Sequence, residues 1–488
     1  MFKFPDSSWP QVNEALEEGL RIDLQKLAKK DLIQINSGLK ELQKKHRQRK
    51  KWVWTELGYS PLVNSLDYLF ELSNETSKPY PSASLDEIIQ FYTDSGFYTD
   101  TCMRKAYSSV KIEKDKSVIK DLIQLMYKPW LEKITEKFQT LVIDNFNDIK
   151  KIKATDTKAK FHLFVDAFRF EMAKEYVSML EQKGVEAELK HRITAFPTLT
   201  STAKVKSSPV ANEVDTASEI KEFTPQFKSG KTALIANFRA ELESKGYQWD
   251  IKRGFEPDKS YWVEIGKIDT YGHQEQADML KRMDDLFDEI TEVIDIATED
   301  GIKDITIVTD HGWLMLPGGL PSDRIIKDLT VARCGRCALI KEGVKTDLIQ
   351  LPWEWNPAVH ITYAPGISFF RKNEEFAHGG ISLQESIVPE IKIKIKQENA
   401  VKSKIENHRW INLRCNIETE NAPDGFLIDI RTKFNDEGTS VVLSRSKSIT
   451  DNKCSLIVDD SVIDSAAFIV LTDDKGVIID KENTSIGN

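Results

Sequence analysis

The feature that most constrains the fold of this chain is a series of short apolar segments that alternate with helical patterns. Phe161–Val165 (FHLFV) is one such segment, and apolar residues at helical spacing follow it from residue 167 to 183, where Gly184 ends the pattern. Similar segments occur at Val185–Leu189, Tyr261–Ile268 and Ile305–Thr309. Alternating strands and helices predict an α/β fold in which helices cover both faces of an open, mostly parallel sheet.

The regions on either side have different patterns, and 488 residues suggest about three domains. Residues 1–158 carry apolar residues at three- and four-residue spacing, which predicts an all-α domain. Residues 159–398 form the predicted α/β domain, and its polar, partly helical stretch at about 207–260 is interpreted as an inserted cap. Residues 399–488 combine short strand patterns with Gly-containing turns and predict a small all-β, sandwich-like domain.

Composition excludes several classes of protein. A formal net charge of -9 argues against a chain that coats nucleic acid with positive charge, although it is compatible with a local basic groove. No segment approaches the ~18–20 apolar residues of a membrane span, and the first residues lack the apolar run of a secretory signal. The 5 cysteines are scattered and do not match a disulfide framework. We therefore expect a soluble, cytoplasmic protein with no membrane association.

Acceptor side chains follow the predicted strands of the α/β domain or stand in its turns. In open α/β sheets, ligands bind beyond the carboxyl ends of the strands, so these side chains are predicted to converge. Each one alone has an ordinary alternative role, as a helix cap, a turn residue or a partner in a loop hydrogen bond. Three of the 8 histidines of the chain are among them. The set comprises Asp166, Asp269, His273, Asp310, His311 and His378.

Three carboxylates and three imidazoles would serve two zinc ions with three protein ligands each, which leaves each ion an open position for substrate or water. Mn²⁺ and Mg²⁺ are alternative ions. A two-metal site of this kind also needs a nucleophile, and a hydroxyl of the loop 195–200 (AFPTLT) is a candidate because it follows a predicted strand. Thr198, Ser201 and Thr202 are rival hydroxyls in the same stretch.

Five short motifs resemble, in their order along the chain, the metal site of the alkaline phosphatase superfamily. They are VDAFRFE, FPTLTS, IDTYGH, VTDHG and AHGG, and their candidate ligands span residues 166–378. The resemblance implies an alkaline-phosphatase-like central sheet. FPTLT is similar to the nucleophile loop of the nucleotide pyrophosphatase/phosphodiesterase branch, in which the second threonine attacks phosphorus. This implies Thr200 as the nucleophile.

The run His378–Pro389 (HGGISLQESIVP), with the helical preface and the β tail, resembles more narrowly the PglZ-domain family, whose members belong to BREX phage-defence systems. This implies other BREX proteins as partners. Members are often longer at the N-terminus, so we expect either a short member or a fragment. The superfamily resemblance also implies two ligand sets, Asp269, His273 and His378 for one zinc and Asp166, Asp310 and His311 with Thr200 for the other.

The substrate that the resemblance implies is a phosphoester. Monoesterases of the superfamily hold the extra negative charge with an arginine or further cations. Arg169 and Lys204 are possible phosphate contacts, but Arg169 could equally pair with Glu171, and no arginine adjoins Thr200. We therefore expect a phosphodiesterase or nuclease that acts on a phosphodiester such as DNA or a nucleotide. The alternatives are a phosphomonoesterase and a non-catalytic, metal-stabilised scaffold for other BREX proteins.

The sequence also contains two weaker signals of possible binding sites. A basic run beside two tryptophans is a candidate contact for nucleic acid, and the alternative is a solvated helix face. Its charged members are Lys44, Lys45, Arg47, Arg49, Lys50 and Lys51. Cys334 and Cys337 (CGRC) resemble half of a zinc knuckle, but no second CxxC accompanies them, so the motif is interpreted as an incidental turn. The sequence does not specify an oligomeric state.

Overall fold

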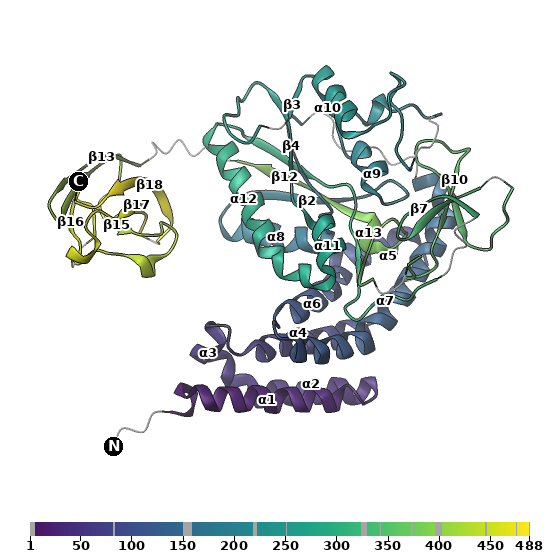
Figure 1. Cartoon of the computed structure of the whole chain (residues 1–488), viewed down its shortest axis with the longest axis horizontal. Coiled ribbons are helices and arrows are strands. Elements are labelled where there is room, and N and C mark those ends of the chain that lie inside the picture. Colours follow the sequence, from purple (N-terminus) through teal and green to yellow (C-terminus); the bar gives the residue numbers. More distant parts are fainter. Residues whose placement is uncertain are drawn as a thin grey trace. The chain divides into compact units, whose positions relative to one another are not determined.

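The structure of the chain is a computed structural model and comprises two compact units, Met1–Lys396 and Gln397–Asn488 (Figure 1). The residues that it describes are 5–81, 83–149, 159–217, 222–249, 251–323, 329–341, 343–371, 374–395, 403–444, 447–474 and 476–487. The predicted domain borders, after residues 158 and 398, lie outside these described residues.

The first unit begins with helices, as the apolar spacing predicts. They are α1 Pro10–Leu27, α2 Leu32–His46, α3 Val53–Glu56, α4 Pro61–Ser77, α5 Leu85–Phe91, α6 Phe97–Ser108 and α7 Glu113–Ile149. α1 and α2 are separate helices because Asp31 caps α2, accepting a hydrogen bond from the Gln34 amide at 2.9 Å. Buried leucines of these helices, such as Leu20, belong to the same apolar core as the central sheet.

A six-stranded sheet in the order β2-β12-β5-β1-β4-β3 forms the centre of the first unit. Its strands are β1 Phe161–Val165, β2 Glu186–Ile193, β3 Tyr247–Trp249, β4 Ser260–Ile265, β5 Asp304–Val308 and β12 Ile387–Lys394. β12 is antiparallel to both neighbours, and the other strands run parallel to one another. All of β1 is buried, so both faces of the sheet are covered there. The predicted α/β class with a mostly parallel sheet is confirmed.

Further helices lie between and around these strands. They are α8 Phe170–Gln182, α9 Thr200–Lys206, α10 Ile235–Ser244, α11 Ile268–Glu275, α12 Met283–Glu299 and α13 Leu383–Ser386. α11 ends before Gln276, which has a φ of 53°, and a 3-10 helix leads from there into α12. Residues 207–260, the predicted cap, contain α10 and also β3, which is the edge strand of the central sheet.

Two smaller sheets follow β5 in the first unit. One is antiparallel and consists of β7 Thr330–Arg333, β8 Cys337–Ile340, β10 His360–Tyr363 and β9 Ile349–Pro352, in that order across the sheet. The other pairs β6 Leu314–Met315 with β11 Phe376–Ala377. Within the described parts of the chain, no helix has both the length and the apolar character needed to cross a membrane.

The second unit consists of two three-stranded antiparallel sheets, β13-β14-β16 and β15-β17-β18. Their strands are β13 Lys404–Ile411, β14 Arg414–Glu420, β15 Leu427–Arg431, β16 Lys453–Ile457, β17 Ala466–Thr472 and β18 Ile478–Ser485. Side chains from both sheets, such as Ile417 and Ile469, share one apolar core. This arrangement confirms the predicted all-β, sandwich-like region.

Candidate metal centre

The carboxyl ends of three adjacent parallel strands bring five of the six predicted ligands to one edge of the sheet. β1 lies between β5 and β4 in the sheet order. Asp166 follows β1 directly, and its amide donates to the carbonyl of Ile265 at the end of β4, at 3.1 Å. Asp269 and His273 lie on α11, which begins three residues after β4, and Asp310 and His311 follow β5.

The sixth candidate, His378, reaches the same place through the short pairing of β6 with β11. β6 continues the segment that carries His311, and its Leu314 lies opposite Ala377 of β11. His378 is the residue after β11, and its ring stacks on that of His311 with centroids 4.5 Å apart and an interplanar angle of 5°. The site therefore combines a sheet edge with a separate two-stranded segment.

One group of ligand atoms consists of Asp269, His273 and His378. The Asp269 Oδ1 atom lies 3.0 Å from His378 Nε2 and 3.6 Å from His273 Nε2, and the two Nε2 atoms are 3.1 Å apart. Ligands of a tetrahedral zinc ion with bonds of about 2.0–2.1 Å stand about 3.3 Å from one another. These three atoms match the spacing of one such ion.

A second group lies beside the first. His311 Nε2 is 3.5 Å from Asp310 Oδ2 and 3.1 Å from the Thr200 hydroxyl oxygen. The two groups are close together, because ligand atoms of Asp269, His311 and His378 all lie within 4.8 Å of one another. Asp310 and His311 are fully buried, whereas His273 is half-exposed, so the cluster opens toward solvent on the side of His273.

Two of the histidines are held so that Nε2 faces the cluster. The Nδ1 atom of His311 lies 2.9 Å from the Gly312 carbonyl, and that of His378 lies 3.2 Å from the Thr198 carbonyl. A carbonyl oxygen only accepts, so Nδ1 carries the proton in both rings and Nε2 is the atom available to a metal. Backbone support of this kind is typical of metal-ligating histidines.

The cluster also contains a buried carboxylate oxygen that lacks a hydrogen-bond partner. Asp310 accepts hydrogen bonds at Oδ1 from the amides of Ala167 and His311, but its Oδ2 atom is buried without a partner. Asp166 does not cap α8, and Asp269 lies within α11 rather than at its cap position. Buried acceptors without partners are costly unless a cation faces them. The donor set therefore fits divalent metal ions.

The pKa values of the cluster also indicate a site that suits divalent metal ions. Burial, together with the charges of Asp310 and Asp269, raises the pKa of Asp166 to about 8. Burial also opposes ionisation of Asp269, but the neighbouring imidazoles outweigh it and hold its pKa below the usual range. The pKa of His378 is raised to about 9, because Asp269 and the Thr198 carbonyl outweigh burial. In the absence of metal, bound protons neutralise part of the negative charge that metal ions would otherwise neutralise.

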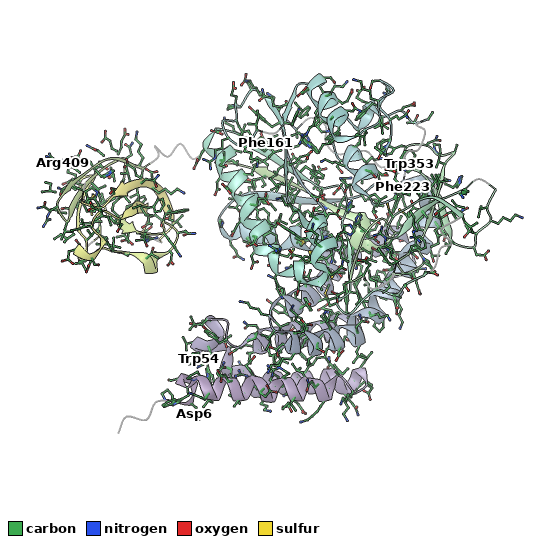
Figure 2. The ribbon with its side chains drawn as sticks, in the orientation of Figure 1. Asp6, Trp54, Phe161, Phe223, Trp353 and Arg409 are labelled. Atoms are coloured by element: carbon green, nitrogen blue, oxygen red, sulfur yellow. The ribbon has the colours of Figure 1, made fainter. Side chains whose placement is uncertain are left out.

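The structure distinguishes the hydroxyls of the predicted nucleophile loop. Thr200 begins α9 and faces His311. Thr198 is buried, donates to the Gly380 carbonyl at 3.0 Å and accepts from the Gly379 amide at 3.0 Å, so it supports the loop of His378. Thr202 donates to the carbonyl of Phe223 and accepts from the indole of Trp353, both labelled in Figure 2.

The two predicted phosphate contacts already have partners. Arg169 is fully buried, with its Nη2 atom 2.7 Å from Asp100 Oδ2 and its guanidinium over the ring of Trp313. Lys204 lies over the ring of Phe164 and its ammonium pairs with Glu264 at 2.8 Å. Their contact with substrate stays a prediction.

The basic run of the N-terminal region is divided between surface and interior. Arg49 is buried and donates to Glu17 Oε1 at 2.6 Å. Two lysines pair with carboxylates, Lys45 with Asp23 and Lys50 with Asp67. The exposed members are Lys44, Lys45, Arg47, Lys50 and Lys51. Nucleic-acid contact by this run also stays a prediction.

A buried ion pair next to the loop that follows His378 was not predicted from the sequence. Arg336 donates through Nε to Glu385 at 3.0 Å, and Glu385 accepts the Gly380 amide at 2.8 Å. A Cβ atom at Gly380 would stand 2.3 Å from Arg336 Nε, so this position requires glycine. The glycines of HGG were the only sequence signal for this close contact.

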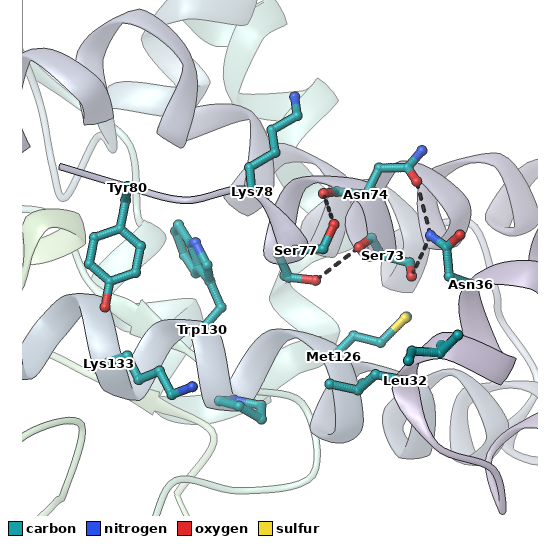
Figure 3. A pocket seen from close by; sticks show the side chains of 13 residues that line it. Leu32, Asn36, Ser73, Asn74, Ser77, Lys78, Tyr80, Met126, Trp130 and Lys133 are labelled. Atoms are coloured by element: carbon teal, nitrogen blue, oxygen red, sulfur yellow. Dashed lines mark hydrogen bonds between the residues drawn. The ribbon is translucent and has the colours of Figure 1, made fainter.

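A separate cavity of about 520 Å³ lies in the N-terminal helical region (Figure 3). Residues of α2, α4 and α7, among them Leu32, Met126 and Trp130, line it. None of the predicted metal ligands contributes to it, so it is distinct from the candidate metal centre.

The fold and this cluster define an α/β protein with a candidate two-metal centre at the carboxyl edge of its sheet. No family model matches the chain, and no curated protein matches its sequence. Solved structures that are similar include the murine ectonucleotide pyrophosphatase/phosphodiesterase 5, with 10% identity and a TM-score of 0.32 over 48% of this chain and 88% of that chain. The human protein has 12% identity and a TM-score of 0.31 over 48% and 87%. Likeness at this level establishes neither fold nor activity for this chain.

Proposed function

We propose that the chain is a metal-dependent phosphoesterase of the alkaline phosphatase superfamily, and more narrowly a PglZ-domain protein. The observation that supports this most is the meeting of Asp and His side chains from four segments beside the Thr200 hydroxyl, 3.1 Å from His311. Asp269, His273 and His378 would hold one divalent ion, and Asp166, Asp310 and His311 the other. Zn²⁺ suits this mixture of carboxylate and imidazole ligands.

When bound, the two ions supply the positive charge that polarises the phosphoryl group and favours ionisation of an alcohol. Thr200 is the nucleophile: its hydroxyl gives its proton to water as Oγ1 forms a bond to phosphorus and the bond to the ester oxygen breaks, and the departing alkoxide takes a proton from water. Water then cleaves the phosphothreonine, which releases a phosphomonoester and regenerates the Thr200 hydroxyl. Thr200 is the first residue of α9, and Leu199 before it has an extended backbone.

The charges around the centre favour a phosphodiester over a phosphomonoester. A monoester carries one more negative charge, and an additional free cation would have to hold it. Arg169 is buried against Asp100, and Lys204 is paired with Glu264. We therefore infer that the substrate is a phosphodiester such as a nucleotide or DNA. From the PglZ resemblance we further infer that the protein acts in the cytoplasm in BREX defence and has other BREX proteins as partners.

Hydrolysis of bis(p-nitrophenyl) phosphate tests the proposal. Metal-stripped protein is assayed with Zn²⁺, Mn²⁺ or Mg²⁺ against this diester and against p-nitrophenyl phosphate, and we expect faster turnover of the diester. Thr200→Ala removes the attacking oxygen and should lower kcat by at least about 10³-fold. Thr200→Ser keeps a hydroxyl and should retain part of the activity.

The matched control is Ser201→Ala, which removes the neighbouring hydroxyl and should leave kcat nearly unchanged. If wild type and Thr200→Ala hydrolyse the diester equally fast, the nucleophile lies elsewhere. If both are inactive with all three metals, the chain is a metal-stabilised scaffold for other proteins rather than an enzyme.

A further inference from the structure

The turn between β7 and β8 places two thiols opposite one another. The hairpin register pairs Arg333 with Ala338, so Cys334 faces Cys337 at the next position, and the Cys334 amide donates to the Cys337 carbonyl at 2.9 Å. Opposed residues in an antiparallel pair have Cα atoms about 4.5–5.5 Å apart, and a disulfide requires about 4.4–6.8 Å. Joining the two thiols therefore needs little movement of the backbone.

The two thiols differ in their access to solvent. Cys334 is partly exposed, whereas Cys337 is fully buried, and both are free thiols. A small reagent can therefore reach Cys334, and Cys337 is positioned to react next. This division into an attacking and a resolving cysteine is typical of thiol pairs that form disulfides reversibly.

The same turn packs against the loop that presents His378. A Cβ atom at Gly379 would lie 3.4 Å from Cys337 Sγ, and one at Gly335 would lie 3.3 Å from the His378 carbonyl. The same Cβ atom at Gly379 would stand 2.9 Å from Leu199, next to the proposed nucleophile. The Cys337 sulfur and the His378 loop are therefore close neighbours, with no room for a side chain at Gly379.

We propose that Cys334 and Cys337 form a thiol–disulfide modification site whose oxidant is a small disulfide, and that its state sets how tightly the neighbouring centre holds metal. The first part stands on the hairpin geometry alone, and the second rests on the proposed function. A Cys334 thiolate attacks one sulfur of the small disulfide and displaces one thiol. The Cys337 sulfur then attacks Cys334 and displaces the second. The two cysteines lose two electrons, and the oxidant leaves as two thiols that carry the two protons.

Formation of the disulfide shortens the distance between the sulfurs to about 2.05 Å. The buried Cys337 sulfur moves with this bond, and we expect the movement to reach His378 because this sulfur lies beside Gly379, the next residue in the chain. A metal ligand displaced by a few tenths of an ångström binds less well, because zinc requires a fixed geometry. We expect the disulfide form to bind Zn²⁺ at least about threefold more weakly than the dithiol form.

Peptide mapping in glutathione buffers tests the site. The full chain is equilibrated at ratios from reduced to oxidised glutathione, alkylated and digested with trypsin, which cleaves after Arg333, Arg336 and Lys341. The disulfide links peptide 334–336 to peptide 337–341, whereas the dithiol gives two separate alkylated peptides. Cys415 and Cys454 are an internal control. They share the core of the second unit but lie opposite Leu456 and Ile417, so they should stay thiols.

The link to metal is measured separately by competition with a chromophoric chelator. Cys334→Ser should make Zn²⁺ affinity independent of the glutathione ratio, while its affinity equals that of the reduced wild type. If no linked peptide forms even with oxidised glutathione in large excess, the modification site is overturned. If the linked peptide forms and Zn²⁺ affinity does not change, the coupling is overturned. Linked peptide and altered Zn²⁺ affinity without phosphoesterase activity would support this inference and reject the proposed function.

Discussion

At the scale of the residue, Asp310 has the environment that depends most directly on a cation. Its side chain is fully buried, and two backbone amides occupy Oδ1. Its Oδ2 atom has no hydrogen-bond partner and lies 3.5 Å from His311 Nε2. Asp166 and Asp269 add further carboxylates to the same cluster. Bound metal would offset this concentration of negative charge, and its removal would leave the charge uncompensated.

The variant Asp310→Asn should therefore weaken metal binding without destabilising the metal-free fold. We expect it to lose about one metal equivalent per chain, since a neutral amide is a poor ligand for zinc. The metal-free variant should unfold at a higher temperature than metal-free wild type, because one buried charge is gone. Metal content by mass spectrometry and melting curves with and without Zn²⁺ measure the two effects.

Asp304→Asn is the matched control, because Asp304 begins the same strand β5 in an exposed position. It should retain the metal and the melting temperature of wild type. If Asp310→Asn binds as much metal as wild type, Asp310 is not a ligand.

The candidate ligands could be predicted at the residue scale, whereas only family resemblance singled out Thr200 among the hydroxyls. A polar residue that follows a buried strand must lie at the sheet edge, which is a local property of the sequence. Thr198, Thr200 and Thr202 are equivalent by that criterion. Their partners distinguish them, and these come from loops near Gly380 and Phe223, far along the chain. Contacts of that range leave no periodic signal in the sequence.

At the scale of the element, the helical region is joined to the α/β region by a buried ionic network between α6 and the segment that leads into α8. Asp100 of α6 accepts hydrogen bonds from Tyr92 and Tyr127 and pairs with Arg169 at 2.7 Å. Glu171, the sequence neighbour considered as a partner for Arg169, pairs instead with Arg104 of α6 at 2.9 Å. Spacing along one helix favours local pairs, and tertiary packing overrides that preference here.

Asp100→Ala should destabilise the first unit by about 3 kcal/mol or more, because it leaves the Arg169 guanidinium buried without its counterion. The exposed Asp94 lies close by in the sequence, and Asp94→Ala should change stability by no more than about 0.5 kcal/mol. Urea unfolding followed by tryptophan fluorescence measures both. Equal stability of the two variants would mean that the network does not hold these elements together.

The short pairing of β6 with β11 shows what sequence patterns miss at this scale. Each strand has two residues, too few for the alternation that identifies longer strands. Yet this pairing brings His378 to His311. His378 was included in the predicted set as a histidine of a glycine-containing turn, but no strand pattern indicated how it would reach His311. The longer strands β1 and β5, by contrast, were predicted from their apolar runs within one residue.

At the scale of the whole molecule, the two large apolar cores of the described residues belong to different units. One includes the helices and the central sheet, and the other lies between the two sheets of the second unit. Units with separate cores can unfold in separate transitions. Titration of a group that is buried in one unit should therefore change the pH dependence of that unit's stability and leave that of the other unit unchanged.

His46 is such a group in the first unit. It is buried, and its Nδ1 atom lies 3.0 Å from Arg49 Nη1, which can only donate, so Nδ1 must accept. Burial, with smaller effects of Arg49 and Lys45 that exceed the opposite effect of Asp23, lowers the pKa of His46 from 6.5 to about 4. In this pH range the unfolded chain binds a proton that the folded chain does not. The neutral ring stabilises the fold above pH 6.5, and this stability is lost as the pH falls toward 4.

The expected loss approaches about 3 kcal/mol for a shift of this size. His46→Gln removes the titration while its amide oxygen can still accept from Arg49, so acid should destabilise the variant less than wild type. Calorimetry between pH 7 and pH 4 should show this difference in the transition of the first unit and none in that of the second. Because other groups also titrate in acid, the comparison of the two proteins, and not the wild-type curve alone, isolates His46. Equal shifts in both proteins would mean that His46 is protonated in the folded chain, and its bond from Arg49 would then have to break above pH 4.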